Sequence, residues 1–158
     1  MKKIFKNIED LMIELEDTNK KKVFTNGCFD ILHLGHLKLL REASYMGEIL
    51  VVGLNSDNSV KKLKGDSRPI NNQDYRASML EFFEFIDYII FFGDETPINL
   101  IEKLKPDVLV KGGDYAKNEI VGSDFIKKNG GEVKIFKFVE NYSSTNQIKK
   151  IIKSRIDE

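Results

Sequence analysis

Two histidines three positions apart are the residues of this 158-residue chain with the clearest capacity for chemistry. His33 and His36 are its only histidines, and they closely follow Gly27. Side chains spaced three apart around the start of a helix can point in the same direction. Imidazoles held in this way can donate hydrogen bonds to phosphate oxygens and offset the charge that builds in a transition state.

The segment around the pair favours an anion site. Gly27 has no Cβ, so backbone amides beside it can approach a ligand closely. The helix expected from about His36 to Met46 would add free N–H groups and the positive end of its dipole. Cys28 lies in the same loop, and we interpret it as a small packing residue because no oriented base is expected for a nucleophile.

Two other interpretations of the pair stay open. One histidine can be a helix cap and the other a core residue. Alternatively, both can bind a metal, with Asp30 as a third ligand. A structural zinc site is disfavoured because no other histidine or cysteine side chain joins the two imidazoles apart from Cys28. We expect no metal site built from protein side chains.

Lysines and an arginine form a second set of candidates. Lys61 and Lys64 belong to a basic run next to Gly65, which can close over a polyphosphate or be a solvated loop. Arg76 is near the start of a helix, where its charge is unfavourable for the dipole. It can therefore bind an external anion, or form a surface salt bridge with Asp74 or Glu81.

Two later motifs are weaker. Gly112, Gly113 and Asp114 follow a predicted strand, where a base or ribose can lie against the backbone; a tight turn explains them equally well. Ser143, Ser144 and Thr145 open the last predicted helix. Their hydroxyls can bind a terminal phosphate or simply cap the helix.

The elements that must position these residues alternate between strand and helix. Strands are expected at 23–25, 49–54, 88–92, 108–110 and 133–139, and helices at about 8–20, 36–46, 72–85, 97–104 and 144–155, with a loop at 55–69. This alternation predicts an α/β fold, a three-layer Rossmann-like domain with a five-stranded, mostly parallel sheet. Ligands bind beyond the carboxyl ends of such strands, where the candidate residues fall.

Composition narrows the class of protein. The 25 basic and 25 acidic residues balance, so no global field draws the chain to nucleic acid or to a membrane surface. One cysteine and no signal peptide favour the cytoplasm, and no apolar run reaches the ~20 residues of a membrane span. We expect a single domain over 1–158, with an N-terminal helix in 1–20 and a Rossmann-like core in 21–158.

The run from Gly27 to His36 resembles the cytidylyltransferase-like nucleotidyltransferase superfamily, whose signature reads Gly-x-Phe-Asp-x-x-His-x-Gly-His. Ser143–Thr145 match its second signature. The runs 63–69 and 110–115 look more specifically like the heptose 1-phosphate adenylyltransferases. Glu140-Asn141 stands where related cytidylyltransferases carry an arginine. Ser144 replaces the usual threonine of the heptose enzymes.

The resemblance implies transfer of AMP from ATP, with Mg²⁺, to D-glycero-β-D-manno-heptose 1-phosphate, giving ADP-heptose for lipopolysaccharide core or another heptose glycan. It implies catalytic roles for His33, His36 and Lys64. Nucleotide contacts would come from Asn26, Gly27, Cys28, Phe29, Gly35, Lys61, Gly112, Gly113, Asp114, Ser143, Ser144 and Thr145. Acceptor contacts would come from Asn55, Asp57, Arg68 and Arg76.

It also implies a homodimer and a separate heptose kinase that supplies the sugar phosphate. Two alternatives remain: a cytidylyl- or guanylyltransferase acting on another sugar or glycerol phosphate, and a non-catalytic nucleotide-binding subunit.

Overall fold

A six-stranded sheet forms the centre of the computed structural model, which describes residues 3–113, 119–137, 147–148 and 152–154. The strands are β1 (Ile4–Phe5), β2 (Lys22–Gly27), β3 (Ile49–Asn55), β4 (Tyr88–Phe92), β5 (Val108–Gly112) and β6 (Glu132–Phe136). Their order is β1-β4-β3-β2-β5-β6, and every neighbouring pair is parallel. The sheet is therefore wholly parallel, with β2 and β3 in its interior.

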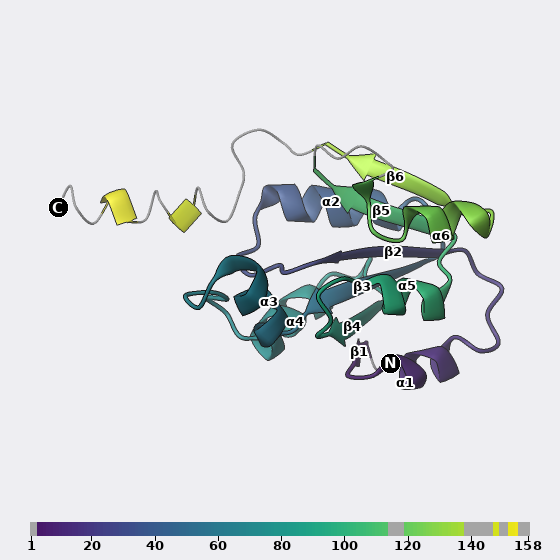
Figure 1. Cartoon of the computed structure of the whole chain (residues 1–158), viewed down its shortest axis with the longest axis horizontal. Helices are drawn as coiled ribbons and strands as arrows, with labels where there is room; N and C mark the ends of the chain where they lie inside the picture. Colours follow the sequence, from purple (N-terminus) through teal and green to yellow (C-terminus); the bar gives the residue numbers. More distant parts are fainter. Residues whose placement is uncertain (1–2, 114–118, 138–146, 149–151, 155–158) are drawn as a thin grey trace.

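Helices cover both faces of this sheet (Figure 1). They are α1 (Ile8–Glu14), α2 (Leu34–Ser44), α3 (Asp57–Lys64), α4 (Gln73–Glu81), α5 (Ile98–Leu104) and α6 (Ser123–Lys128). Two hydrophobic cores result, one between the sheet and α1, α5 and α6, the other between the sheet and α2 and α4. The predicted three-layer Rossmann-like α/β fold is confirmed.

Strand β3 shows why the sequence folds in this way. All seven of its residues are buried, as expected for a strand covered on both sides. Ile49 and Val51 join the first core, whereas Leu50, Val52 and Leu54 join the second. The alternation of side chains along the strand thus distributes one apolar run between two layers.

Several predicted elements need correction. The sheet has six strands rather than five, because the two-residue β1 pairs with β4. The N-terminal helix covers 8–14 rather than most of 1–20, and α6 was not predicted. The last predicted strand, 133–139, ends at Phe136 within the described residues. Of the predicted C-terminal helix, the described residues 147–148 and 152–154 are helical.

The segment 55–69, predicted as a loop, contains helix α3. Ser56 caps it by accepting a hydrogen bond from the backbone N–H of Ser59, and Val60 is fully buried. Asp57 lies in the first turn and lysines in the last turn, which suits the helix dipole. The basic residues of the predicted loop are therefore carried on a helix.

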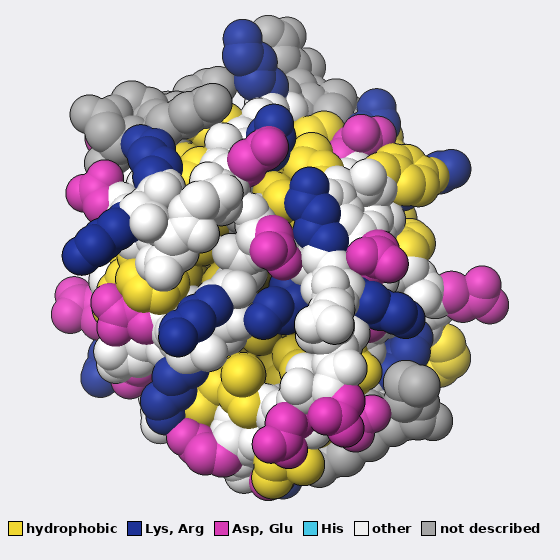
Figure 2. Space-filling view, turned by 90° about the vertical axis from the view of Figure 1, so that its right-hand side faces the viewer, with side chains coloured by type: hydrophobic (Ala, Val, Ile, Leu, Met, Phe, Trp, Pro, Cys, Tyr) yellow, Lys and Arg dark blue, Asp and Glu magenta, His cyan; other side chains and the backbone are white. Residues whose placement is uncertain are grey.

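Neither charge dominates the side of the molecule that lies at the right of Figure 1. Figure 2 shows basic and acidic side chains intermingled there with apolar ones. This agrees with the balanced composition. Within the described part of the chain, no helix is long and apolar enough to cross a membrane.

Candidate active site

The carboxyl ends of the central strands surround a cavity. Its volume is ≈ 340 Å³, within the ~300–1,000 Å³ usual for small-molecule sites. Residues from the ends of β2, β3, β4 and β5 line it together with residues that follow them: Asn26, Gly27, Cys28, Asn55, Leu63, Phe92, Glu95, Thr96, Pro97, Leu109, Lys111, Glu119, Ile120 and Val121. The cavity therefore lies where parallel sheets of this type bind ligands.

The two histidines lie together at the start of α2. Their rings stack with centroids 3.7 Å apart and an interplanar angle of 22°. His33 is the N-cap, and its Nδ1 accepts a hydrogen bond of 3.4 Å from the backbone N–H of His36. In a neutral His33 the proton then resides on Nε2, which becomes a donor. The helix-cap interpretation is thus correct for His33, and it still leaves one ring nitrogen for a ligand.

Both imidazoles are held in the neutral form. The pKa of His36 is lowered to about 3, chiefly by burial and also by the nearby charges of His33 and Lys64, while a backbone hydrogen bond at Ile31 acts in the opposite direction. Burial also lowers the pKa of His33, again with a contribution from Lys64. At neutral pH the pair therefore carries no charge, and His33 keeps its Nε2–H as a donor.

Phe29 and Gly27 hold the histidine rings in this arrangement. The ring of Phe29 meets His36 edge to face, with centroids 5.2 Å apart. Phe29 adopts a φ of 45°, which non-glycine residues rarely do. A Cβ at Gly27 would come within 3.1 Å of the Phe29 ring, so the glycine makes room for this ring. Lys64, at the end of α3, is exposed.

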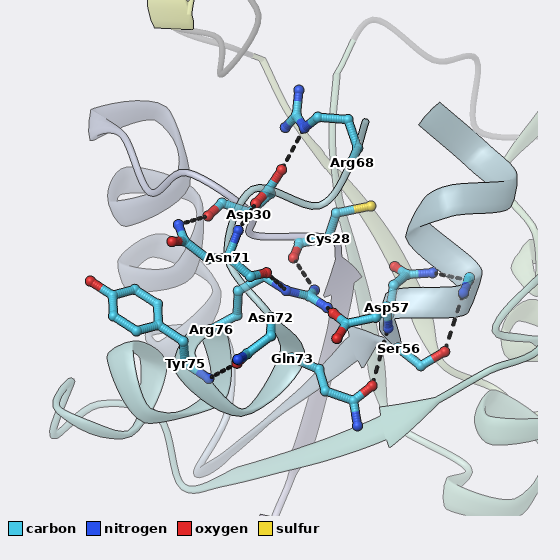
Figure 3. Close-up of polar contacts among 12 residues, drawn as sticks. Cys28, Asp30, Ser56, Asp57, Arg68, Asn71, Asn72, Gln73, Tyr75 and Arg76 are labelled. Atoms are coloured by element: carbon cyan, nitrogen blue, oxygen red, sulfur yellow. Dashed lines mark hydrogen bonds and ion pairs between the residues drawn. The ribbon is translucent and has the colours of Figure 1, made fainter. Parts of the chain in front are cut away.

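Arg76 is a structural residue of the loop. Its side chain is buried, with 1% of the residue exposed, and donates in three directions (Figure 3). Nη1 donates to the carbonyl oxygen of Cys28 at 2.5 Å, Nη2 to Oδ1 of Asp57 at 2.8 Å and Nε to the carbonyl oxygen of Asn71 at 3.0 Å. The alternative of a surface salt bridge with Asp74 or Glu81 is wrong, because the charge of Arg76 pairs internally with Asp57.

Asp30 holds the other end of the same loop. Its Oδ1 accepts hydrogen bonds from the backbone N–H groups of Ile70 and Asn71 at 2.8 and 2.9 Å, and Oδ2 accepts one from Nε of Arg68 at 2.5 Å. Burial raises the pKa of Asp30, but these hydrogen bonds outweigh burial and hold the pKa below its usual value. Asp30 is thus an ionised anchor rather than the third metal ligand considered from the sequence. Nor do the described residues contain any cluster of three potential metal ligands.

The remaining predicted residues are only partly brought together. Asn55 is buried at the cavity wall and donates from Nδ2 to the Ser59 hydroxyl at 2.9 Å. Gly112 ends β5 and Gly113 follows it, with the N–H of Gly113 donating to the Phe136 carbonyl at 3.0 Å. Gly35 is buried in α2, and Lys61 is exposed on α3. Asp114, Ser143, Ser144 and Thr145 lie outside the described residues.

Lys111 is the residue that the predictions passed over. It precedes Gly112, lines the cavity and donates from Nζ to Oδ1 of Asn26 at 3.1 Å. Burial lowers its pKa, which a nearby Cys28 thiol partly opposes. A lysine that directly follows a buried apolar strand was the pattern that could have identified it.

Comparisons with known proteins relate this chain to a family and to longer relatives. The family model described as cytidylyltransferase-like matches residues 24–152. The bifunctional protein HldE of Aliarcobacter butzleri is 55% identical over 94% of this chain, and that of Helicobacter pylori is 50% identical over 95%. The chain spans 30% and 32% of the lengths of these two relatives.

Solved structures show a related fold. A lipopolysaccharide core biosynthesis protein of Thermoplasma volcanium superposes with a TM-score of 0.63 at 28% identity, covering 79% of this chain and 100% of its own. A pantoate-β-alanine ligase of Francisella tularensis, in complex with an ATP analogue and β-alanine, superposes with a TM-score of 0.65 at 14% identity. It covers 97% of this chain and 80% of its own, and at this identity the likeness concerns the fold alone.

Proposed function

This chain belongs to the cytidylyltransferase-like family, and on that premise we propose that it transfers AMP from ATP to D-glycero-β-D-manno-heptose 1-phosphate. The runs 63–69 and 110–115, together with about 50–55% identity to bifunctional HldE proteins, support this acceptor. The products would be ADP-heptose and pyrophosphate, with the heptose destined for lipopolysaccharide core or another glycan.

The stacked histidine pair is the observation that carries the proposal. An oxygen of the sugar phosphate attacks the α-phosphorus of ATP, a new P–O bond forms, and the bond to the bridging oxygen breaks so that pyrophosphate leaves. The residues need to provide positioning and charge stabilisation rather than a covalent intermediate. Neutral His33 and His36 at the N-terminus of α2 suit this task, because they donate to phosphate oxygens without needing to lose a proton.

We propose that the histidine pair and Lys64 bind the triphosphate. The charge of Lys64 is close enough to lower the pKa of both imidazoles. The nucleoside would lie along Gly112, Gly113 and Asp114. The distal phosphates would meet Ser144 and Thr145. Arg68 and Arg76 are reassigned from acceptor binding to holding the loop, because each forms a partly buried ion pair with a carboxylate.

Mg²⁺ would arrive with the nucleotide. Magnesium prefers one or two carboxylates combined with substrate phosphates, and the described residues offer no cluster of three ligands that could form a protein cage. When bound, the ion would neutralise phosphate charge. We further propose a homodimer in the cytoplasm, supplied with sugar phosphate by a heptose kinase.

The test is a matrix of pyrophosphate release. The protein is incubated with Mg²⁺, with ATP, GTP or CTP, and with heptose 1-phosphate, other sugar 1-phosphates or glycerol 3-phosphate. Release with ATP and the heptose phosphate alone supports the proposal. Release only with CTP and glycerol 3-phosphate would overturn the acceptor and the base. No release with any pair, from a protein that binds ATP, would indicate a nucleotide-binding subunit.

A further inference from the structure

Lys111 is the only basic residue among the described residues that line the cavity beyond the strand ends. The other two cations expected near the acceptor already have an internal counter-ion: Arg68 pairs through Nε with Asp30, and Arg76 pairs with Asp57. If a phosphorylated acceptor enters this cavity, a cation other than these two arginines must balance the charge of its phosphate. This reasoning rests on the proposed function, which supplies the phosphorylated acceptor.

The environment of the Lys111 ammonium suits that role. It is partly buried, and its one described hydrogen bond runs from Nζ to the amide oxygen of Asn26 at 3.1 Å. No carboxylate among the described residues lies within salt-bridge distance of it. An ammonium has three donors, and a buried charge without a counter-ion is costly. Lys111 therefore has both spare donors and an unmet need for an anion.

The position of the cavity supports the same conclusion. Asn26, Gly27 and Cys28 belong to the segment that runs from the end of β2 towards the histidine pair. Lys111 is the next-to-last residue of β5, the strand next to β2, and its Nζ donates to Asn26. An anion on Lys111 would thus be separated by one loop from an anion on the histidines. In-line transfer between two phosphates requires two neighbouring anion sites of this kind.

We propose that Lys111, oriented by Asn26, forms a phosphate-binding subsite in this cavity and binds the 1-phosphate of the sugar acceptor. Lys111 is then a substrate-binding residue of the acceptor, and Asn26 is its positioning residue. The triphosphate of ATP remains with the histidine pair and Lys64. Recognition of the acceptor begins with its phosphate, and the other residues that line the cavity contact the sugar.

The first experiment measures phosphate binding without any reaction. Inorganic phosphate is titrated calorimetrically into the wild-type protein and into Lys111→Met, Lys111→Arg, His36→Ala and Lys38→Met. Lys38 is an exposed lysine of α2 and serves as the matched control. We expect Lys111→Met to weaken phosphate binding by at least about tenfold, the scale of a charge-assisted hydrogen bond, with smaller loss in Lys111→Arg and none in Lys38→Met. Loss in His36→Ala with none in Lys111→Met would overturn the subsite.

The second experiment separates the two substrates. Lys111→Met should raise KM for the sugar 1-phosphate by at least about tenfold and leave KM for ATP within about twofold. A rise in KM for ATP with an unchanged KM for the sugar phosphate would assign Lys111 to the nucleotide and overturn the proposal. If the wild type releases no pyrophosphate with any pair, the proposed function fails, and the phosphate titration still decides the subsite.

Thermal unfolding excludes a purely structural role. Replacing a partly buried, unpaired ammonium by an apolar side chain of similar length should leave Tm unchanged or raise it. Phosphate should raise the Tm of the wild type and of Lys38→Met by more than that of Lys111→Met, which retains only the anion site of the histidine pair. A large fall in Tm for Lys111→Met, with no recovery of phosphate binding in Lys111→Arg, would make Lys111 a structural residue and overturn the proposal.

Discussion

Two groups of partly or fully buried basic side chains lie near the loop after β2, and their surroundings differ. Arg68 and Arg76 each contact a carboxylate, at 2.5 and 2.8 Å. His33, His36 and Lys111 have no carboxylate partner among the described residues. Removing one partner of a buried ion pair is destabilising, because the other charge is left uncompensated. A buried basic group without a carboxylate partner can accept an anion from solution. The difference separates the residues that hold the loop in place from the residues that can bind an anionic ligand.

The largest effect should follow from breaking the paired group. Arg76→Met removes the contacts with Asp57 and with the Cys28 and Asn71 carbonyls, and should lower the free energy of unfolding by about 3 kcal/mol. Urea unfolding measures this, with the exposed Arg41→Met as control. A variant that keeps its stability but loses affinity for the sugar phosphate would return Arg76 to the acceptor site and erase the distinction.

Changing a residue of the group without a carboxylate partner should lower activity and leave the fold intact. His36→Ala should lower kcat by at least ~10², the scale of a lost transition-state donor, while the protein stays folded. Pyrophosphate release gives kcat, and circular dichroism checks the fold. Unchanged activity, or a loss that merely follows unfolding, would remove His36 from the catalytic group.

Lys64 should have a smaller effect because it is exposed. Lys64→Met should reduce kcat/KM for ATP by about tenfold, and the loss should shrink at high salt. The same change should raise the pKa values of His33 and His36, because the Lys64 charge lowers both. NMR titration of the histidines measures this shift. Histidine pKa values that stay the same in the variant would place Lys64 away from the pair.

The effect that is smallest at neutral pH concerns the His36 proton, and it grows only on acidification. The folded-state pKa of His36, about 3, is below its ordinary 6.5, so below about pH 6.5 the unfolded chain binds a proton that the folded chain does not. Stability should therefore fall as the pH drops from about 6.5 towards 3, by up to ~1.4 kcal/mol per pH unit for this group. His36→Gln should flatten the slope. Asp30, whose pKa is also lowered, loses its contribution only below its ordinary pKa of 3.8. An equal slope in His36→Gln would contradict the neutral pair.

The elements that the sequence predicts well are those with a long apolar pattern. The seven-residue run of β3 and the histidine motif at the start of α2 fall where the sequence analysis expects them. Helix α3 was missed because its lysines dominate the pattern, although the Ser56 cap and the buried Val60 were visible in the sequence. Strand β1 has only two residues and owes its existence to pairing with β4.

The site was harder to predict than the fold because partners distant in sequence decide what a charge does. Arg76 lies within a predicted helix and Lys111 directly follows a predicted strand, each as an isolated basic residue. Only the folded chain brings Asp57 to Arg76 and leaves Lys111 with the neutral Asn26. No local pattern distinguishes these outcomes, since the contacts of Arg76 with Cys28 and of Lys111 with Asn26 span 48 and 85 positions.

The clamping of the loop between Cys28 and Asp30 also has a kinetic consequence. Arg76 fixes one end and the Asp30 carboxylate fixes the other, so the loop loses its conformational freedom during folding and not when a ligand arrives. Nucleotide should then associate in a single phase whose rate rises linearly with concentration, with no slow isomerisation of this loop. Arg76→Met, if it folds, should acquire such a slow phase, because the untethered loop would sample several shapes between encounters.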